Sequence, residues 1–152
     1  FDRPRSLTDN VTPSGTSALV AALRIVGALA ERPELVERAD RAARTTWATV
    51  AENPRFAGAA LADLLVSDEA RRGLKPAVAV VVGDDPFGEL TRASWRLAPA
   101  GSYVVTAPEG AEGWGSHFEQ RPEGFAYVCR GTVCFDPVDD YNDLKTPLWS
   151  RV

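Results

Sequence analysis

Hydrophobic residues recur with a helical period through the first half of the chain. Apolar positions are spaced three or four residues apart over residues 12–30, and Pro13 stands where a first helical turn tolerates its missing N–H. Similar stripes run through residues 31–54 and 54–73, and Gly73 is a typical helix stop. The pattern predicts three consecutive helices with short loops, as in a helical bundle or an α/α array.

The hydrophobic pattern changes after Pro76. Residues 77–83 form an unbroken apolar run rich in valine, which is typical of a strand buried on both faces. A short helical pattern over residues 86–97 and a second strand pattern over 102–108 complete a small βαβ-like unit. Residues 125–137 then predict a strand, a tight turn and another strand.

These patterns predict an α+β protein in two parts. Residues 1–75 form the helical part, and residues 76–152 form a small α/β part that contains a β-hairpin. The turn-rich residues 109–117 are expected to form an exposed loop, and residues 139–149 a short helix with a tail.

Charge and composition narrow the range of partners. The net charge is −4 and no basic stripe is present, so no nucleic-acid partner is expected. The longest apolar stretch, residues 17–30, contains Arg24 and falls short of the ~18–20 apolar residues that cross a bilayer, so no membrane partner is expected. Two cysteines do not make a disulfide scaffold and no signal peptide is visible, which predicts a cytoplasmic protein.

The chain contains no methionine and begins with Phe1. A native start leaves a methionine unless it is trimmed, and trimming is rare before so bulky a residue. The sequence is therefore interpreted as a fragment of a longer protein whose N-terminal portion is missing.

Two segments resemble one known family. Residues 8–25, TDNVTPSGTSALVAALRI, resemble a D-N-x-x-P-S-G-N-S segment, with Thr16 in place of the second asparagine. Residues 126–138, AYVCRGTVCFDPV, resemble a Y-V-C-x4-C-x-x-P-V segment. Both segments occur in this order near the C-terminus of thioredoxin-domain proteins related to spermatogenesis-associated protein 20 and bacterial YyaL.

The resemblance implies a larger architecture around this chain. Such proteins have an N-terminal thioredoxin-like domain and an α/α-barrel similar to the six-hairpin toroids of sugar epimerases and glycosidases. Residues 1–75 would then be closing helices of the toroid, and residues 76–152 a C-terminal appendage. The implied partner is the N-terminal remainder of the same polypeptide, its thioredoxin-like domain and barrel.

Cys129 and Cys134 are the first candidates for chemistry. If Gly131 and Thr132 form a two-residue turn, the cysteines face each other in a non-hydrogen-bonded pair with Cα atoms ~4.5 Å apart, within reach of a disulfide. In a cytosolic protein they can instead be two reduced, half-buried small residues. A catalytic dithiol is not expected, because no predicted helix begins beside either thiol. The single histidine, His117, lies in a Gly-rich loop where exposure is expected, so neither a metal nor a cofactor is predicted.

Asp9, Asn10 and Ser14 form the second candidate group. They precede a predicted helix, where their side chains can cap its free N–H groups. In an α/α-toroid, the loops at helix starts also line the ligand funnel, so the same side chains can face a cavity.

Two functions follow from these patterns. The first is a non-catalytic C-terminal portion that completes the barrel and carries a redox-sensitive Cys129/Cys134 pair. The alternative is part of a sugar-processing enzyme, epimerase-, isomerase- or glycosidase-like, to which Asp9, Asn10 and Ser14 contribute cavity residues. Helices cut from their neighbours would expose apolar faces, so self-association of the fragment is also expected.

Overall fold

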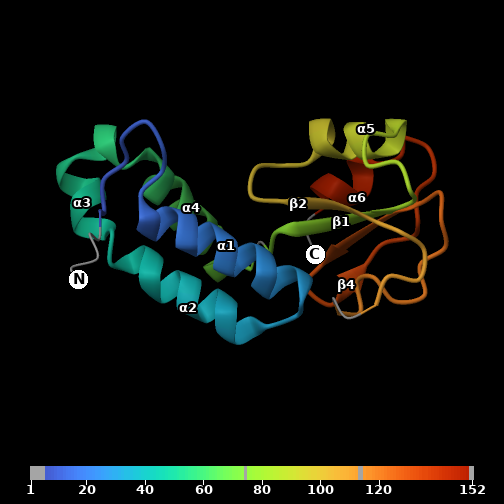
Figure 1. The fold of residues 1–152 in the computed structure, drawn as a ribbon, viewed down its shortest axis with the longest axis horizontal. Helices are drawn as coiled ribbons and strands as arrows, with labels where there is room; N and C mark the ends of the chain where they lie inside the picture. The colour runs from blue at the N-terminus through green and yellow to red at the C-terminus, as the bar shows by residue number, and fades with distance from the viewer. Residues whose placement is uncertain (1–5, 74, 113–114, 151–152) are drawn as a thin grey trace. The chain divides into compact units, whose positions relative to one another are not determined.

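The computed structural model describes residues 6–73, 75–112 and 115–150. The chain divides into two compact units, Phe1–Ala28 with Arg32–Gly73, and Leu29–Glu31 with Leu74–Val152. The first unit is helical and the second contains a four-stranded sheet, so the expected α+β class is confirmed (Figure 1). In the described part of the chain, no helix has the length and apolar character needed to cross a membrane.

The helical unit is built from short elements around small core residues. They are α1 (Gly15–Leu29), α2 (Pro33–Arg44), α3 (Trp47–Glu52), the 3-10 turn η1 (Pro54–Phe56) and α4 (Gly58–Arg71). Val20 packs with Ala39 and Ala43 of α2, and Leu64 of α4 contacts this cluster. Leu64 also contacts a second cluster around Val50, so α4 joins both clusters. Alanines at these positions allow the helices to approach closely.

The single helix expected over residues 31–54 is wrong, because the chain turns between α2 and α3. The Thr45 hydroxyl donates to the Ala42 carbonyl at 2.7 Å, and the Thr46 hydroxyl donates to the Ala43 carbonyl at 2.6 Å. The backbone N–H groups of both threonines bond the same carbonyls, three residues back. Side-chain bonds of this kind compete with the α-helical ladder and end α2 at Arg44.

The second unit is built on a mixed sheet. Its strands are β1 (Ala77–Val82), β2 (Tyr103–Ala107), β3 (Ala126–Arg130) and β4 (Val133–Cys134), in the order β2-β1-β3-β4. β1 pairs parallel to β2 and antiparallel to β3, and every residue of β1 is buried, as the valine run predicts. The connection between the parallel strands β1 and β2 runs through α5 (Glu89–Leu97), as in the expected βαβ-like unit.

The two faces of this sheet have different coverings. Ala79 and Val81 of β1 and Val128 of β3 face a core that includes Leu144 and Leu148. Leu90 and Leu97 of α5 pack on the same core, and α6 (Lys145–Trp149) lies on that side too (Figure 1). Strand alternation places the side chains of Tyr127 and Cys129 on the opposite face, where the candidate site lies.

Candidate functional site: a cysteine pair beside a buried histidine

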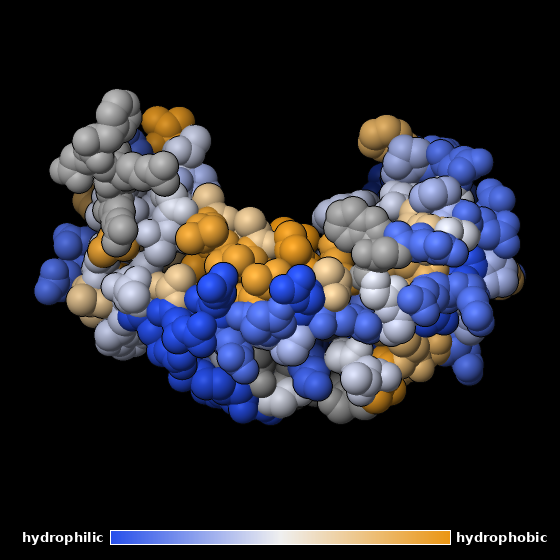
Figure 2. Space-filling view, turned by 60° about the horizontal axis from the view of Figure 1, so that its bottom comes forward, coloured by the Kyte–Doolittle hydropathy of each residue, from blue (hydrophilic) through white to orange (hydrophobic). Residues whose placement is uncertain are grey.

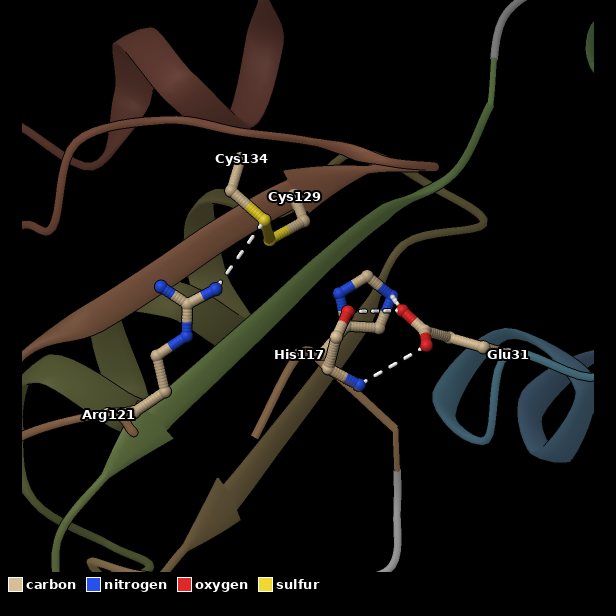
Figure 3. Close-up of a disulfide and its surroundings, with 6 residues drawn as sticks. Glu31, His117, Arg121, Cys129 and Cys134 are labelled. Atoms are coloured by element: carbon tan, nitrogen blue, oxygen red, sulfur yellow. Dashed lines mark hydrogen bonds and ion pairs between the residues drawn. A yellow bond between two sulfur atoms is a disulfide. The ribbon is translucent and has the colours of Figure 1, made fainter. Parts of the chain in front are cut away.

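The hairpin of β3 and β4 brings the two cysteines together. Cys129 is the cross-strand partner of Cys134, and Arg130 pairs with Val133, which confirms the expected register. The Cα atoms of the cysteines lie 4.0 Å apart and their sulfur atoms form a disulfide (Figure 3). The turn depends on Gly131, whose φ of +61° lies in the left-handed region that favours glycine.

The two sulfur-bearing residues differ in their access to solvent. Cys129 is 0% exposed, because β3 is covered on both sides by β1 and β4 and by side chains on its face. Cys134 is exposed and lies on β4, which is the edge strand of the sheet. The residue at one end of the disulfide is therefore exposed to solvent, and the residue at the other end is buried.

His117 lies beside the disulfide and is 4% exposed, so the expectation of an exposed histidine is wrong. Its neighbour Phe118 is also buried, and this apolar anchor folds the segment against the unit. Part of the turn-rich loop expected over residues 109–117, Gly113 and Trp114, lies outside the described residues. Burial lowers the pKa of His117, opposed in part by the nearby Glu31 carboxylate, so the neutral imidazole is favoured at neutral pH.

Glu31 holds the loop that carries His117. Leu29–Glu31 belongs to the same compact unit as the sheet. The Glu31 carboxylate accepts hydrogen bonds from the Ser116 hydroxyl at 2.5 Å and the Ser116 N–H at 3.2 Å, and these bonds lower its pKa. A side chain at Gly115 would approach the Leu29 carbonyl to 3.1 Å, so glycine permits this close contact.

The two nitrogens of His117 have different surroundings. Nε2 lies 3.9 Å from Glu31 Oε1, an ion-pair distance rather than a hydrogen bond. Nδ1 is buried and has no hydrogen-bond partner. Figure 3 shows the imidazole between the Glu31 carboxylate and the disulfide.

Arg121 places a positive charge next to the exposed sulfur. Its Nη2 atom lies 3.6 Å from Cys134 Sγ. The guanidinium also lies over the ring of Tyr127, 4.6 Å from the centroid, in a cation–π contact. The Tyr127 hydroxyl donates to the Pro122 carbonyl at 3.1 Å, so the ring that supports Arg121 is itself held in place.

Asp9 and Ser14 make helix-capping contacts in the helical unit. Ser14 Oγ accepts a hydrogen bond from the Ser17 N–H at 3.1 Å, which makes Ser14 the cap of α1. The two carboxylate oxygens of Asp9 accept the Ser14 N–H at 2.9 Å and the Ala59 N–H at 2.8 Å, so Asp9 joins the starts of α1 and α4. Asn10 is exposed, and its backbone N–H donates to the Thr12 carbonyl.

The start of α1 could be predicted from the sequence more closely than the residues that surround the cysteine pair. α1 begins at Gly15, two residues later than the Pro13 start that the pattern predicts, because Ser14 caps it. Sequence reasoning missed Glu31, Ser116 and Arg121, which lie far from the cysteines along the chain. No spacing signal marks them. A serine, a histidine and a phenylalanine in succession after Gly115 are the one local hint that this loop turns inward.

A separate pocket lies elsewhere on the sheet unit. Glu89, Asp139 and Asp140 contribute carboxylates to its lining, with Leu90, Gly124 and Tyr141. Asp140 also accepts hydrogen bonds from the backbone and side chain of Asn142, both at 2.8 Å. That carboxylate therefore stabilises a local turn.

Comparisons with known proteins identify no relative of this chain. No protein-family model matches the chain, and no curated protein or solved structure matches it significantly. The relation to thioredoxin-domain proteins therefore remains a prediction from the two motifs around Asp9 and Cys129.

Proposed function

We propose that this chain is a non-catalytic C-terminal portion of a thioredoxin-domain protein and that its Cys129–Cys134 hairpin responds to the thiol–disulfide balance of its surroundings. The redox proposal rests on one observation: the buried Cys129 of β3 is paired with the exposed Cys134 of the edge strand β4. A buried structural disulfide would shield both sulfur atoms. This one leaves Cys134 open to attack.

The exchange reaction follows from this asymmetry. A thiolate from an external monothiol or dithiol attacks Cys134 Sγ, the sulfur–sulfur bond breaks, and Cys129 leaves as a thiolate that takes up a proton. A second thiol group attacks the mixed disulfide, releases Cys134 and forms the disulfide of the reductant. In total, the hairpin gains two electrons, with one proton where Cys134 stays a thiolate and two where both cysteines are protonated.

Arg121 supports the reduced state. With Nη2 3.6 Å from Cys134 Sγ, the guanidinium favours a thiolate over a neutral thiol once the disulfide opens. Stabilising the reduced form makes the disulfide easier to reduce. Arg121 therefore makes the Cys129–Cys134 disulfide easier to reduce.

The test is a redox titration in glutathione buffers, with thiols counted by alkylation and mass spectrometry. The wild-type chain is expected to pass between no thiols and two while its circular dichroism stays native. Arg121→Gln should make reduction harder, with the equilibrium constant shifted a few-fold, as expected for a charge pair near the surface. The control Arg41→Gln removes an exposed arginine of α2 and should leave the midpoint unchanged. A disulfide that resists every buffer until the chain unfolds would contradict the proposal.

The helical unit supports the barrel part of the proposal. Its helices follow one another with short connections, as in α/α arrays. Hydrophobic side chains remain exposed on its helices; they include Leu19, Ile25 and Val26 of α1 and Leu61 and Leu65 of α4. Figure 2 shows hydrophobic surface directly beside strongly hydrophilic surface. We propose that further helices of the same polypeptide cover these residues.

A further inference from the structure

We infer that the reduced hairpin and His117 form a site for a zinc ion. This inference rests on the proposed function, because the two sulfur atoms become available as ligands only when the disulfide is reduced. It differs from the sequence-based expectation that the chain holds no metal. The reason for the difference is the buried position of His117, which sequence patterns do not reveal.

The ligand atoms already lie close together. One ring nitrogen of His117 and the sulfur atoms of Cys129 and Cys134 all lie within 4.8 Å of one another. In a tetrahedral zinc site with Zn–S and Zn–N bonds of ~2.3 and ~2.0 Å, such ligand atoms are roughly 3.5–3.8 Å apart. Opening the disulfide lets the sulfurs move apart, and rotation of the three side chains would bring their ligand atoms to these distances.

The second observation is the unsatisfied nitrogen of His117. Nδ1 is buried without a hydrogen-bond partner, on a side chain that is 5% exposed. Buried polar atoms usually have a partner, so an orphaned nitrogen next to two sulfurs indicates a missing ligand. A metal bond at Nδ1 would satisfy it.

Glu31 fits the role of a positioning residue for that histidine. Its carboxylate lies 3.9 Å from Nε2 and is held by two hydrogen bonds from Ser116. Metal-binding histidines commonly direct their second N–H to a carboxylate, which orients the ring and fixes the tautomer. With Nε2 directed toward Glu31, Nδ1 is left for the metal (Figure 3).

The surroundings leave one coordination position of the metal open and place the positive charge of Arg121 near it. Cys134 is exposed, so a water molecule can reach the fourth position of a three-ligand site. Arg121 lies beside Cys134. Its positive charge stabilises the Cys134 thiolate in the metal-free chain, but it repels a divalent cation. Arg121→Gln should therefore strengthen metal binding while it makes the disulfide harder to reduce. The two effects have opposite directions, which separates the metal site from the redox switch.

The test uses the chain reduced under argon with a phosphine reductant, titrated with Co²⁺ and then with Zn²⁺ against a chromophoric chelator. We expect one equivalent of Co²⁺ to give a thiolate-to-metal charge-transfer band and the intense visible bands of a tetrahedral site, and Zn²⁺ to displace it. Cys134→Ser and His117→Gln should each weaken Zn²⁺ binding by at least tenfold, and Arg121→Gln should tighten it. Circular dichroism of the metal-free variants checks that they remain folded.

The outcomes separate the two proposals. Two free thiols without cobalt bands would overturn the metal site and leave the redox proposal standing. Cobalt bands that persist unchanged in folded His117→Gln would show binding by the cysteines alone and overturn the assigned site. A folded wild-type chain that yields no thiols under strong reductant would overturn both proposals. As a control, the oxidised chain should bind no Co²⁺ at this site.

Discussion

At the scale of single residues, Asp9 shows how one side chain can stabilise two helices. Its oxygens accept the Ser14 and Ala59 N–H groups, which would otherwise be unpaired at the starts of α1 and α4. We predict that Asp9→Ala lowers the free energy of unfolding by about 1–3 kcal/mol, measured by urea denaturation. Asp9→Asn keeps one acceptor oxygen and should lose about half as much.

The neighbouring Asn10 provides the matched control. It is exposed, so Asn10→Ala should change stability by less than about 0.5 kcal/mol. If Asp9→Ala left stability unchanged, the capping role would be contradicted and a cavity role for Asp9 would gain support.

Asp63 of α4 should make the stability of the chain depend on pH. Burial raises its pKa above the ordinary 3.8, although Arg24 Nη1 lies 3.6 Å from its carboxylate and opposes the shift. Because the folded state then holds the proton more tightly than the unfolded state, wild-type stability falls as pH rises from below 3.8 through the raised pKa. Asp63→Asn cannot titrate and lacks this loss.

The free energy of unfolding of Asp63→Asn relative to wild type should therefore increase with pH across that window and then level off. Chemical denaturation at a series of pH values measures it. Glu69→Gln, at an exposed position of the same helix, serves as the control. A difference between Asp63→Asn and wild type that stays constant with pH would contradict the assignment.

His117 illustrates what single-residue reasoning cannot supply. A histidine in a glycine-rich segment is expected to be exposed, and this expectation is wrong here because burial is decided by tertiary contacts. Glu31 and Ser116 are 85 residues apart in sequence, so their pairing has no local signature.

At the scale of elements, the β3–β4 hairpin follows directly from its turn. A glycine in a two-residue loop fixes which residues face each other, so the cysteine pairing could be predicted from sequence. The valine run of β1 likewise predicts its burial on both faces. The break between α2 and α3 could not be read from the apolar stripe, because it depends on hydrogen bonds of Thr45 and Thr46.

The hairpin turn should be sensitive to a single methyl group. At Gly131, φ is +61°, and an added Cβ would lie 2.7 Å from the Lys75 side chain. Gly131→Ala should lower the free energy of unfolding by about 1–2 kcal/mol, because the left-handed conformation is costly for other residues. Reduced protein should be used, so that the disulfide does not mask the loss.

Gly15 is the matched control for this substitution. It lies at the first position of α1, and an added Cβ would contact nothing within 4 Å. Gly15→Ala should therefore be neutral or slightly stabilising. Equal stability losses at both glycines would argue against strain at the turn.

At the scale of the whole molecule, the division into two units lies close to the change of hydrophobic period at Pro76. The change of hydrophobic period marks this boundary because helices and strands require different spacings of apolar residues. The grouping of Leu29–Glu31 with the sheet unit was not predictable, since it rests on contacts such as Glu31 with Ser116. The proposed barrel involves chain beyond these residues, and its support remains the exposed apolar side chains and the two motifs.

Those exposed side chains predict self-association of the isolated chain. Leu65 of α4 is 58% exposed, and uncovered apolar groups of this kind tend to find partners. Sedimentation velocity should show a mass that increases with concentration, and Leu65→Lys should reduce it. Glu69→Lys adds positive charge to the same helix and serves as the control. A monodisperse wild-type monomer at high concentration would contradict the prediction.

The most direct test of the central proposal is a thiol count on the folded chain. The protein is purified without reductant, exposed to a glutathione buffer, and alkylated first without and then with denaturant, and modified Cys134 and Cys129 are identified by mass spectrometry. We predict no modified cysteine before the buffer and modified Cys134 after it, with native circular dichroism, whereas the buried Cys129 is modified only in the denaturant step. Modification of Cys134 only after unfolding would contradict the redox-responsive hairpin and leave the disulfide as a structural crosslink.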